Sequence, residues 1–282
     1  MHTTRFAPSP TGLLHLGHAF AALRAFEAAR GGTFLLRIED LDSGRVRPEY
    51  ATAIEEDLAW LGLSWKRPVL HQSTRLQAYR HALATLLERQ LLYPCFCTRK
   101  EIALEIARAG YAPHQSDYVV YPGTCRDLTA SDRERAIAHG QPYVMRLHVA
   151  KAAAHVPALS FLENGTGPSG QHGPIQVTAA ALGDIVLARK DIPVAYHLAV
   201  VIDDSFQEVS LVTRGSDLFS ATHVQRLLQA LLGLAVPQYA HHRLILDSQG
   251  NKFSKRDQAV TLRSLREQGL STAQVRARIE RL

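Results

Sequence analysis

Two histidines near the start of the chain have the types and spacing best suited to chemistry on a phosphate. His15 and His18 stand at the two ends of the string HLGH, directly after a turn rich in Pro, Ser and Gly. At this spacing both imidazoles lie on one face of a first helical turn, where the positive end of the helix attracts anions. We interpret the pair as groups that stabilise charge on the α-phosphate of ATP. Gly17, between them, leaves room for a flat base.

A lysine-rich string near the other end of the chain could supply a cation for the same phosphates. It reads KFSKR, from Lys252 to Arg256, and lies on a Gly-containing loop. Found alone, a His/Gly/His string or a Lys-rich loop is usually a helix start or a solvated turn. The order of the two strings, and the strand-turn-helix setting of the first, favour a nucleotide site in this chain.

The elements that must position these residues alternate between strands and helices. We expect strands at 3–7 and 34–38, with a helix from about 15 to 30 between them. Two further helices each show one apolar face, the first opening at Pro48 and the second capped by Ser73. This alternation predicts an α/β fold with a parallel sheet, whose ligands lie at the carboxyl ends of the strands.

The amino-acid composition changes in the middle of the chain, where cysteines and clusters of Pro and Gly appear. We interpret this part as an insertion between two halves of one sheet, after which the alternation resumes. The tail after the KFSKR string is too short to form a further domain. The expected units are a first half at 1–91, an inserted subdomain at 92–182, a second half at 183–245, and the loop with a short helical tail at 246–282.

Composition places the chain among globular proteins with a sizeable core, since 46% of its 282 residues are hydrophobic. The sequence lacks a membrane-length apolar stretch and an apolar signal segment, so we expect no membrane association and a cytoplasmic location. A formal net charge of +6 and a pI near 9.4 suit a polyanionic partner without requiring one, because solubility alone explains such a charge.

Three cysteines are too few, and odd in number, for a disulfide framework, so their spacing matters more than their count. Cys95 and Cys97 come just after Tyr93, and the string Tyr121-x-x-x-Cys125 comes about one short helix later. Three thiolates and a phenolate could surround zinc tetrahedrally, although tyrosine is an unusual ligand. From the spacing alone, a metal site and a set of buried apolar cysteines both remain open.

Charged residues at predicted strand ends would suit a dicarboxylic amino acid, which needs cations for its carboxylates and an anion for its ammonium group. Arg5 precedes the first turn, Glu39 ends the second strand, and Arg214 follows a strand at 208–213. Ion pairing between strands is the simpler role for each of them. Their position beside a phosphate site favours substrate binding.

The two strings together resemble the HIGH and KMSKS signatures of class I aminoacyl-tRNA synthetases, a family with a Rossmann-like parallel sheet. The run RFAPSPTG and the string RIED further resemble the glutamate and glutamine branch of that family, and the resemblance covers essentially the whole chain. It implies a catalytic role for His15, His18 and Lys255. The implied ATP-binding residues are Pro8, His15, Gly17, His18, Lys252, Ser254 and Lys255, and those implied for glutamate are Arg5, Ala7, Ser9, Glu39, Tyr196 and Arg214.

The resemblance also bears on the cysteines. Truncated relatives of glutamyl-tRNA synthetase carry one zinc ion in this insertion on the pattern Cys-x-Cys, Tyr-x-x-x-Cys, which implies the ligands Cys95, Cys97, Tyr121 and Cys125. His114, Tyr118 and His139 are rivals for the fourth position. One departure from the family lies in the segment YHLAVVIDD, where Val200 replaces an asparagine that helps to hold the substrate, so we expect weaker glutamate binding. In the same segment, Asp203 and Asp204 could orient the KFSKR loop or a metal ion, but we expect them to serve as turn and cap acceptors.

The reaction that the resemblance implies is the activation of L-glutamate by Mg²⁺ and ATP without tRNA, followed by transfer of glutamate to queuosine in the anticodon of tRNA(Asp). The chain ends where full-length relatives continue, so we expect no anticodon-binding domain, and we expect a monomer. Three alternatives remain: a synthetase that charges a tRNA 3′ end, a non-catalytic tRNA-binding paralogue, and a nucleotidyltransferase. The last shares the histidine helix but has no need for Arg5, Glu39 and Arg214 together.

Overall fold

The computed structural model describes residues 1–102, 120–189, 193–245 and 260–281. Its centre is a mainly parallel sheet in two parts, with strand orders β1-β2-β3 and β7-β6-β10-β9. The backbone N–H of Ser210, just before β9, donates to the carbonyl of Thr3 in β1 at 2.9 Å and so joins the two parts. The strands are β1 (Thr3–Phe6), β2 (Thr33–Ile38), β3 (Lys66–His71), β6 (Ser160–Glu163), β7 (Gly173–Gln176), β9 (Leu211–Gly215) and β10 (Gln238–His242).

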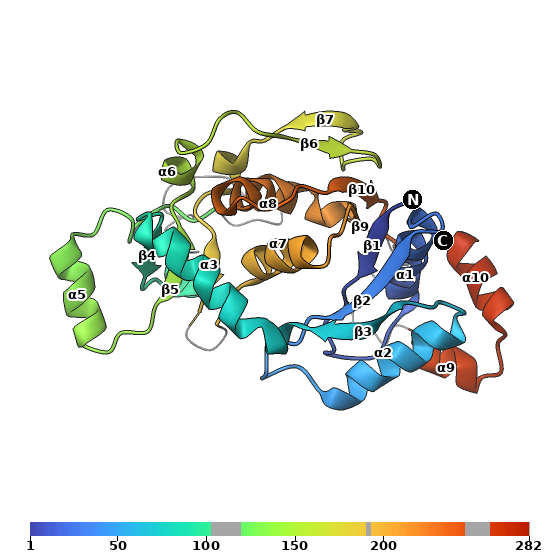
Figure 1. The fold of residues 1–282 in the computed structure, drawn as a ribbon. Helices are drawn as coiled ribbons and strands as arrows, with labels where there is room; N and C mark the ends of the chain where they lie inside the picture. The colour runs from blue at the N-terminus through green and yellow to red at the C-terminus, as the bar shows by residue number, and fades with distance from the viewer. Residues whose placement is uncertain (103–119, 190–192, 246–259, 282) are drawn as a thin grey trace.

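Helices cover both faces of this sheet (Figure 1). Alternate residues of a strand point to opposite faces, so β2 sends Leu36 and Ile38 into the core beneath α1 and α2, while Arg37 points to the other side. That other side faces α7 and α8. The covering helices are α1 (Leu16–Ala28), α2 (Pro48–Trp60), α3 (Leu76–Glu88), α7 (Tyr196–Phe206) and α8 (Phe219–Leu232), the last two joined by β9 and the short turn η3 (Ser216–Leu218).

The α/β class and the parallel sheet predicted from the alternation are confirmed. The helix at Pro48 begins as expected, with proline in its first turn and Ile54 and Leu58 fully buried. The predicted cap at Ser73 is wrong. Ser73 lies inside a 3₁₀ turn, η1 (Gln72–Arg75), and its N–H and hydroxyl both donate to Asp40 at 2.8 Å. The carboxylate of Asp40, which follows β2, thus accepts two hydrogen bonds from Ser73, and Arg75 takes the N-cap position of α3.

A second, antiparallel sheet of order β4-β5-β8 lies at the end of the molecule opposite α9 and α10 (Figure 1). Three strands cross the expected limits of the insertion. β8 follows residue 182 but pairs with β5. β6 and β7 precede residue 182 but belong to the main sheet, where β6 pairs with β10 and β7 pairs with β6. The elements here are β4 (Leu92–Cys95), α5 (Ala130–Ala138), β5 (Val144–Leu147), α6 (Val149–Ala153), η2 (Ala179–Leu182) and β8 (Val186–Ala188).

The short helical tail consists of α9 (Leu262–Glu267) and α10 (Thr272–Arg281). Leu262 and Val275 are fully buried and pack into the same core as α1 and α2. The N–H of Leu262 donates to the carbonyl of Leu14, and Thr261 forms an antiparallel bridge with His15. The tail is therefore fastened to the start of α1. Among the described helices, none is both long and apolar enough to cross a membrane.

Candidate active site and thiol cluster

The start of α1 brings the two histidines of HLGH together. His15 is the N-cap residue, with extended backbone, and His18 lies in the first turn. Their rings stack with centroids 3.7 Å apart, and the N–H of His15 donates to Nδ1 of His18 at 3.3 Å. His15 is buried and His18 half-buried. The two imidazoles thus share the positive end of the helix, where an anion is favoured; their role toward ATP stays a prediction.

The turn before α1 links the first two strands at their carboxyl ends. The N–H of Glu39, just after β2, donates to the carbonyl of Pro8 at 3.0 Å. Pro8 is buried, Ala7 is half-buried and Ser9 is exposed. The residues predicted from the KFSKR string, Lys252, Ser254 and Lys255, lie outside the described part of the chain.

Arg5 lies in a buried ion pair with Asp204 of α7. Its Nε and Nη2 lie 3.0 and 3.3 Å from the two carboxylate oxygens. Nη2 of Arg37 lies 2.8 Å from the same carboxylate, and Nη1 of Arg5 donates to the carbonyl of Thr213. Burial alone would raise the pKa of Asp204, but the charges of Arg5 and Arg37 outweigh burial and hold that pKa below its usual value. These contacts tie β1, β2 and β9 to one helix.

Glu39 lies at the edge of this network. Its Oε1 is 3.8 Å from Nη2 of Arg37, too long for a strong hydrogen bond. Burial raises the pKa of Glu39 to about 7, and the lowering effects of Arg37 and Arg5 are smaller. An anion whose pKa lies this high gains from a cationic partner, such as the ammonium group of an amino acid.

Arg214, near the end of β9, is held by four neighbouring side chains. Its Nε donates to Nε2 of His241 at 3.1 Å, and its Nη2 donates to the hydroxyl of Thr222 at 2.6 Å. Its Nη1 donates to Oε1 of Gln225 at 2.8 Å and lies 3.5 Å from the hydroxyl of Tyr196. All four acceptors are uncharged groups. The guanidinium is therefore fixed in place without a carboxylate within hydrogen-bond distance among the described residues.

The structure thus brings four of the residues predicted for glutamate into one region. Arg5 and Arg214 lie on the same face of the sheet and are linked through the backbone of Thr213; Glu39 reaches the same network through Arg37, and Tyr196 begins α7 beside Arg214. Val200 is buried in the core against α3 and α8, as part of an apolar cluster. Whether these residues bind glutamate stays a prediction.

The expected turn and cap roles of Asp203 and Asp204 are wrong. Both lie within α7 and are buried. Asp203 accepts hydrogen bonds from the amide of Gln72 at 2.9 Å and the hydroxyl of Tyr79 at 2.6 Å, and Arg75 lies 3.3 Å away. Asp203 therefore fastens the segment after β3 to α7, while Asp204 fastens β1 and β2 to the same helix.

The buried side chains that hold the arginines in place were not predicted from the sequence. Arg37 is completely buried in an otherwise apolar strand, which is a signal that a carboxylate partner must exist. The partners themselves lie far away in the sequence, so their identity could not be read from it. The missed residues are Arg37, Glu163, Thr222, Gln225 and His241.

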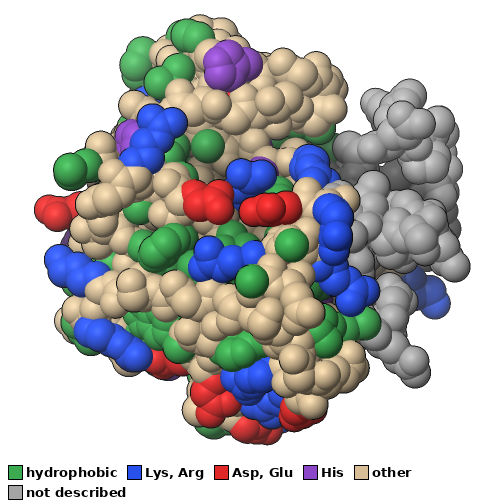
Figure 2. Space-filling view, turned by 90° about the vertical axis from the view of Figure 1, so that its right-hand side faces the viewer, with side chains coloured by type: hydrophobic (Ala, Val, Ile, Leu, Met, Phe, Trp, Pro, Cys, Tyr) green, Lys and Arg blue, Asp and Glu red, His purple; other side chains and the backbone are tan. Residues whose placement is uncertain are grey.

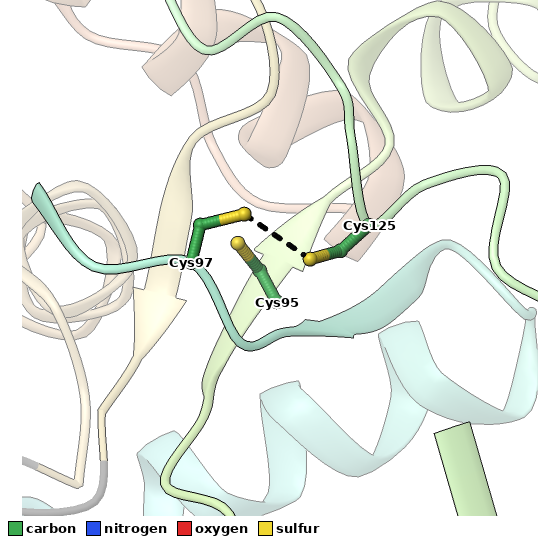
Figure 3. A group of neighbouring side chains, drawn as sticks. All are labelled: Cys95, Cys97 and Cys125. Carbon is green, nitrogen blue, oxygen red and sulfur yellow. Dashed lines mark hydrogen bonds between the residues drawn. The ribbon is translucent and has the colours of Figure 1, made fainter. Parts of the chain in front are cut away.

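The three cysteines converge at the end of β4 (Figure 3), with their sulfurs within 4.8 Å of one another. The sulfurs of Cys97 and Cys125 are 3.3 Å apart, and the N–H of Phe96 donates to Cys125 at 3.4 Å. Burial alone would raise the pKa of Cys125, but hydrogen bonds from Tyr121 and from this N–H outweigh burial and lower that pKa. Three convergent thiols can hold a metal ion, as the spacing allowed.

Tyr121 completes the cluster as the fourth predicted ligand. Its hydroxyl oxygen lies 3.6 Å from the sulfur of Cys97 and accepts the N–H of Cys125 at 2.7 Å. The guanidinium of Arg146 lies 3.9 Å from the centre of the ring. Burial and the hydrogen bond with Cys95 raise the pKa of the Tyr121 phenol. His139 instead ends α5, exposed, with Nδ1 at 2.7 Å from the carbonyl of Arg135. His114 and Tyr118 lie outside the described residues.

The net positive charge is not concentrated on the face that carries α9 and α10. Figure 2 shows basic and acidic side chains interspersed there, with hydrophobic groups between them. Over its described residues, this face therefore offers no single basic field that would attract a polyanion.

The fold and the site define a class of enzyme. A family model described as the catalytic domain of class I tRNA synthetases (E and Q) matches residues 2–282. Among solved structures, glutamate-tRNA synthetase from Elizabethkingia anophelis is similar with a TM-score of 0.73 and 29% identity, covering 91% of this chain. The chain spans 53% of the length of that protein.

Curated relatives match over most of their length. Glutamyl-Q tRNA(Asp) synthetase of Rhodobacter capsulatus is 47% identical, covering 97% of this chain and 98% of the relative. The protein of the same name from Nitratidesulfovibrio vulgaris is 42% identical, covering 96% of this chain and 83% of the relative. The chain therefore belongs to the class I tRNA synthetases of the glutamate and glutamine branch, among the relatives named glutamyl-Q tRNA(Asp) synthetase.

Proposed function

We propose that the chain activates L-glutamate with ATP in the absence of tRNA and transfers the glutamyl group to queuosine in the anticodon of tRNA(Asp). The observation that carries the first step is that Glu39 and Arg214 lie at the carboxyl ends of β2 and β9, in the sheet whose first strand leads into α1 and its two histidines. A dicarboxylic amino acid requires charges of both signs, and ATP is favoured by a helix end that attracts phosphate.

In the activation step, an oxygen of the glutamate α-carboxylate attacks the α-phosphorus of ATP. The bond to the β-phosphate breaks, pyrophosphate leaves, and glutamyl-adenylate remains. His15 and His18 stabilise the negative charge that grows on the α-phosphate. Lys255 and the Mg²⁺ bound with ATP neutralise the negative charge of the leaving pyrophosphate. Because the step consists of positioning and charge stabilisation, it needs no covalent enzyme intermediate.

The amino acid is oriented by groups of opposite charge. Arg214 binds a carboxylate of glutamate, because the described side chains bonded to its guanidinium are all neutral, and Tyr196 lies beside the same guanidinium. Glu39 binds the ammonium group. Ser9 lies on the carboxylate side, and Arg5 supports that side through its ion pair with Asp204. Ala7, Pro8 and Gly17 line the space between amino acid and nucleotide, and Lys252 and Ser254 bind ATP.

In the transfer step, a hydroxyl oxygen of the acceptor attacks the carbonyl carbon of the adenylate. An ester forms, AMP leaves, and the hydroxyl proton is lost to solvent. The names of the relatives support queuosine of tRNA(Asp) as the acceptor. The name of the solved glutamate-tRNA synthetase supports a tRNA 3′ end as the alternative acceptor.

We further propose that Cys95, Cys97, Tyr121 and Cys125 hold one structural zinc ion. The donor set fits, because three sulfurs and a phenol oxygen converge, and backbone N–H groups donate to the sulfur of Cys125 and to the phenol oxygen of Tyr121. Purified protein should contain about one zinc per chain by elemental analysis. Cys125→Ser should lose most of it, and Cys125→Ser with full zinc content would exclude this ligand set.

The experiment that tests the function follows labelled glutamate. The enzyme, ATP and labelled glutamate are incubated with tRNA(Asp) that carries or lacks queuosine, and with tRNA(Glu). Labelling that needs queuosine, and that prior periodate oxidation of its diol prevents, is the expected result. Labelling of the 3′ end of tRNA(Glu) would replace the proposed acceptor by the alternative one, and no labelling at all, without pyrophosphate exchange, would indicate a non-catalytic protein.

A further inference from the structure

His241 in β10 lies between a buried carboxylate and the guanidinium of Arg214. Its Nδ1 is 2.6 Å from Oε2 of Glu163, and its Nε2 accepts the Nε–H of Arg214 at 3.1 Å. His241 and Glu163 are both buried, with side chains that are completely shielded from solvent. The three side chains form a line from β6 through β10 to β9.

The hydrogen-bond donors in this line allow only one form of the imidazole. An arginine stays protonated in proteins, so its Nε carries a hydrogen and Nε2 of His241 must accept. Nδ1 then carries the proton and donates to Glu163. Burial lowers the pKa of His241, and the carboxylate of Glu163 offsets only part of this effect, so the ring is neutral at neutral pH. A proton on Nε2 would point at the Nε–H of Arg214, so two donors would repel each other and this hydrogen bond would be lost.

The carboxylate of Glu163 is itself held firmly. Its Oε1 accepts the N–H groups of His241 and Gly165 at 2.8 and 2.9 Å, which leaves Oε2 to face the imidazole. Gly165 lies so close to β10 that an added Cβ would be 2.2 Å from the carbonyl oxygen of His241. The loop after β6 thus packs directly on the backbone that carries the imidazole, and Glu163 cannot turn away without breaking these bonds.

We propose that Glu163 and His241 are positioning residues that fix the imidazole tautomer and thereby aim Arg214 at a carboxylate of the amino-acid substrate. The inference rests on the proposed function, since Arg214 is the group that binds glutamate there. With Thr222, Gln225 and Tyr196, His241 completes a set of neutral acceptors that orients the guanidinium without neutralising its charge. A fixed arginine loses little freedom when the carboxylate binds, which favours affinity.

The nearly isosteric substitution Glu163→Gln separates this role from simple packing. The amide oxygen of the introduced side chain would keep the two backbone N–H bonds, and its NH₂ group would then face Nδ1 of His241. The imidazole would have to accept there and carry its proton on Nε2, against the N–H of Arg214. We expect the KM for glutamate to rise about tenfold to a hundredfold, by analogy with the range found when the hydrogen-bond partner that orients a metal-binding histidine is changed. The KM for ATP should stay the same.

The tautomer can be read without any activity measurement. Nitrogen NMR of protein with ¹⁵N-labelled histidine distinguishes the two neutral tautomers, and His241→Gln identifies the signals of this ring by their loss. The expected result is a proton on Nδ1 in the wild-type protein and on Nε2 in Glu163→Gln. Glu88→Gln, at an exposed position, is the matched control and should change neither the spectrum nor the KM for glutamate.

The possible outcomes distinguish the positioning role of Glu163 and His241 from the proposed function. The same tautomer in both proteins would overturn the role of Glu163, and a changed tautomer with an unchanged KM for glutamate would overturn the positioning of Arg214. If Glu163→Gln fails to fold, a wild-type ring protonated on Nε2 still overturns the inference, and one protonated on Nδ1 supports it. Wild-type protein without glutamate-dependent pyrophosphate exchange would overturn the proposed function alone, because the NMR result decides the tautomer independently.

Discussion

Two arginines that were predicted to bind the same substrate are equally buried but differ in what surrounds them. Arg5 is 5% exposed and faces the carboxylate of Asp204 through two hydrogen bonds. Arg214 is 6% exposed and, among the described side chains, bonds to an imidazole, a hydroxyl, an amide and a phenol. The charge of Arg5 is compensated within the protein, whereas that of Arg214 remains for an incoming anion.

The difference shows that position at a strand end does not by itself make an arginine a substrate ligand. A buried charge needs a partner, and the partner decides its role. Asp204 makes Arg5 part of the framework that joins β1 to α7. The neutral acceptors around Arg214 orient its guanidinium, but they do not neutralise its positive charge, so a substrate carboxylate can still pair with it. Substitution of each arginine should therefore affect a different property.

The largest effect on substrate binding is expected from Arg214→Gln. Loss of a charge-assisted contact to a carboxylate should weaken glutamate binding a few hundredfold, about 3.5 kcal/mol. The unfolding free energy should change much less, because the acceptors around residue 214 are neutral and Gln can bond to some of them. Calorimetric titration with glutamate measures the first quantity and urea denaturation the second. Unchanged glutamate affinity would remove Arg214 from the site.

Arg5→Gln should chiefly reduce stability. It removes one of the two arginines that compensate buried Asp204, which costs about 3 kcal/mol of unfolding free energy. The second change Asp204→Asn should cost further stability, because it leaves fully buried Arg37 without its nearest carboxylate, and the double-mutant cycle measures the coupling between residues 5 and 204. Arg45→Gln, in an exposed ion pair with Asp42, is the control and should cost less than about 1 kcal/mol. A stability equal to that of the wild type would contradict the framework role.

A smaller effect should appear in the pH dependence of glutamate use. Burial raises the pKa of Glu39 to about 7, so this carboxyl gains a proton as the pH falls through 7 and can then no longer attract an ammonium group. The kcat/KM for glutamate should decrease about tenfold between pH 7.5 and pH 6. In Glu39→Gln the value should be low and flat over that range. A wild-type profile that is flat there would mean that Glu39 does not carry the charge that binds the substrate.

Local features of the fold could be predicted because they depend on neighbours in the sequence. The strand, turn and helix around HLGH follow from a Pro-rich break between apolar segments, and Pro48 opens a helix whose apolar face repeats with helical spacing. The spacing of the cysteines and Tyr121 left a metal site and buried apolar cysteines both open, and the resemblance to truncated relatives favoured the metal site. The cysteine sulfurs indeed lie together.

The partners of the buried charges could not be predicted, because they come from distant parts of the chain. Arg5 pairs with Asp204, and Glu163 reaches Arg214 only through His241. Nothing in the local sequence distinguishes such an acid from a cap or a turn acceptor, which is why Asp204 was assigned a different role. Burial and pairing across the sheet decide it, and both exist only in the folded chain.

Exchange of labelled pyrophosphate into ATP, without tRNA, tests the central claim most directly. The wild-type protein should exchange only when glutamate is present, and Arg214→Gln should lose most of that exchange at a glutamate concentration that saturates the wild type, with an unchanged KM for ATP. Arg5→Gln, assayed below its unfolding temperature, should keep most of the exchange. Exchange that does not depend on glutamate, or equal losses in the two variants, would contradict the assignment of Arg214 as the carboxylate-binding residue.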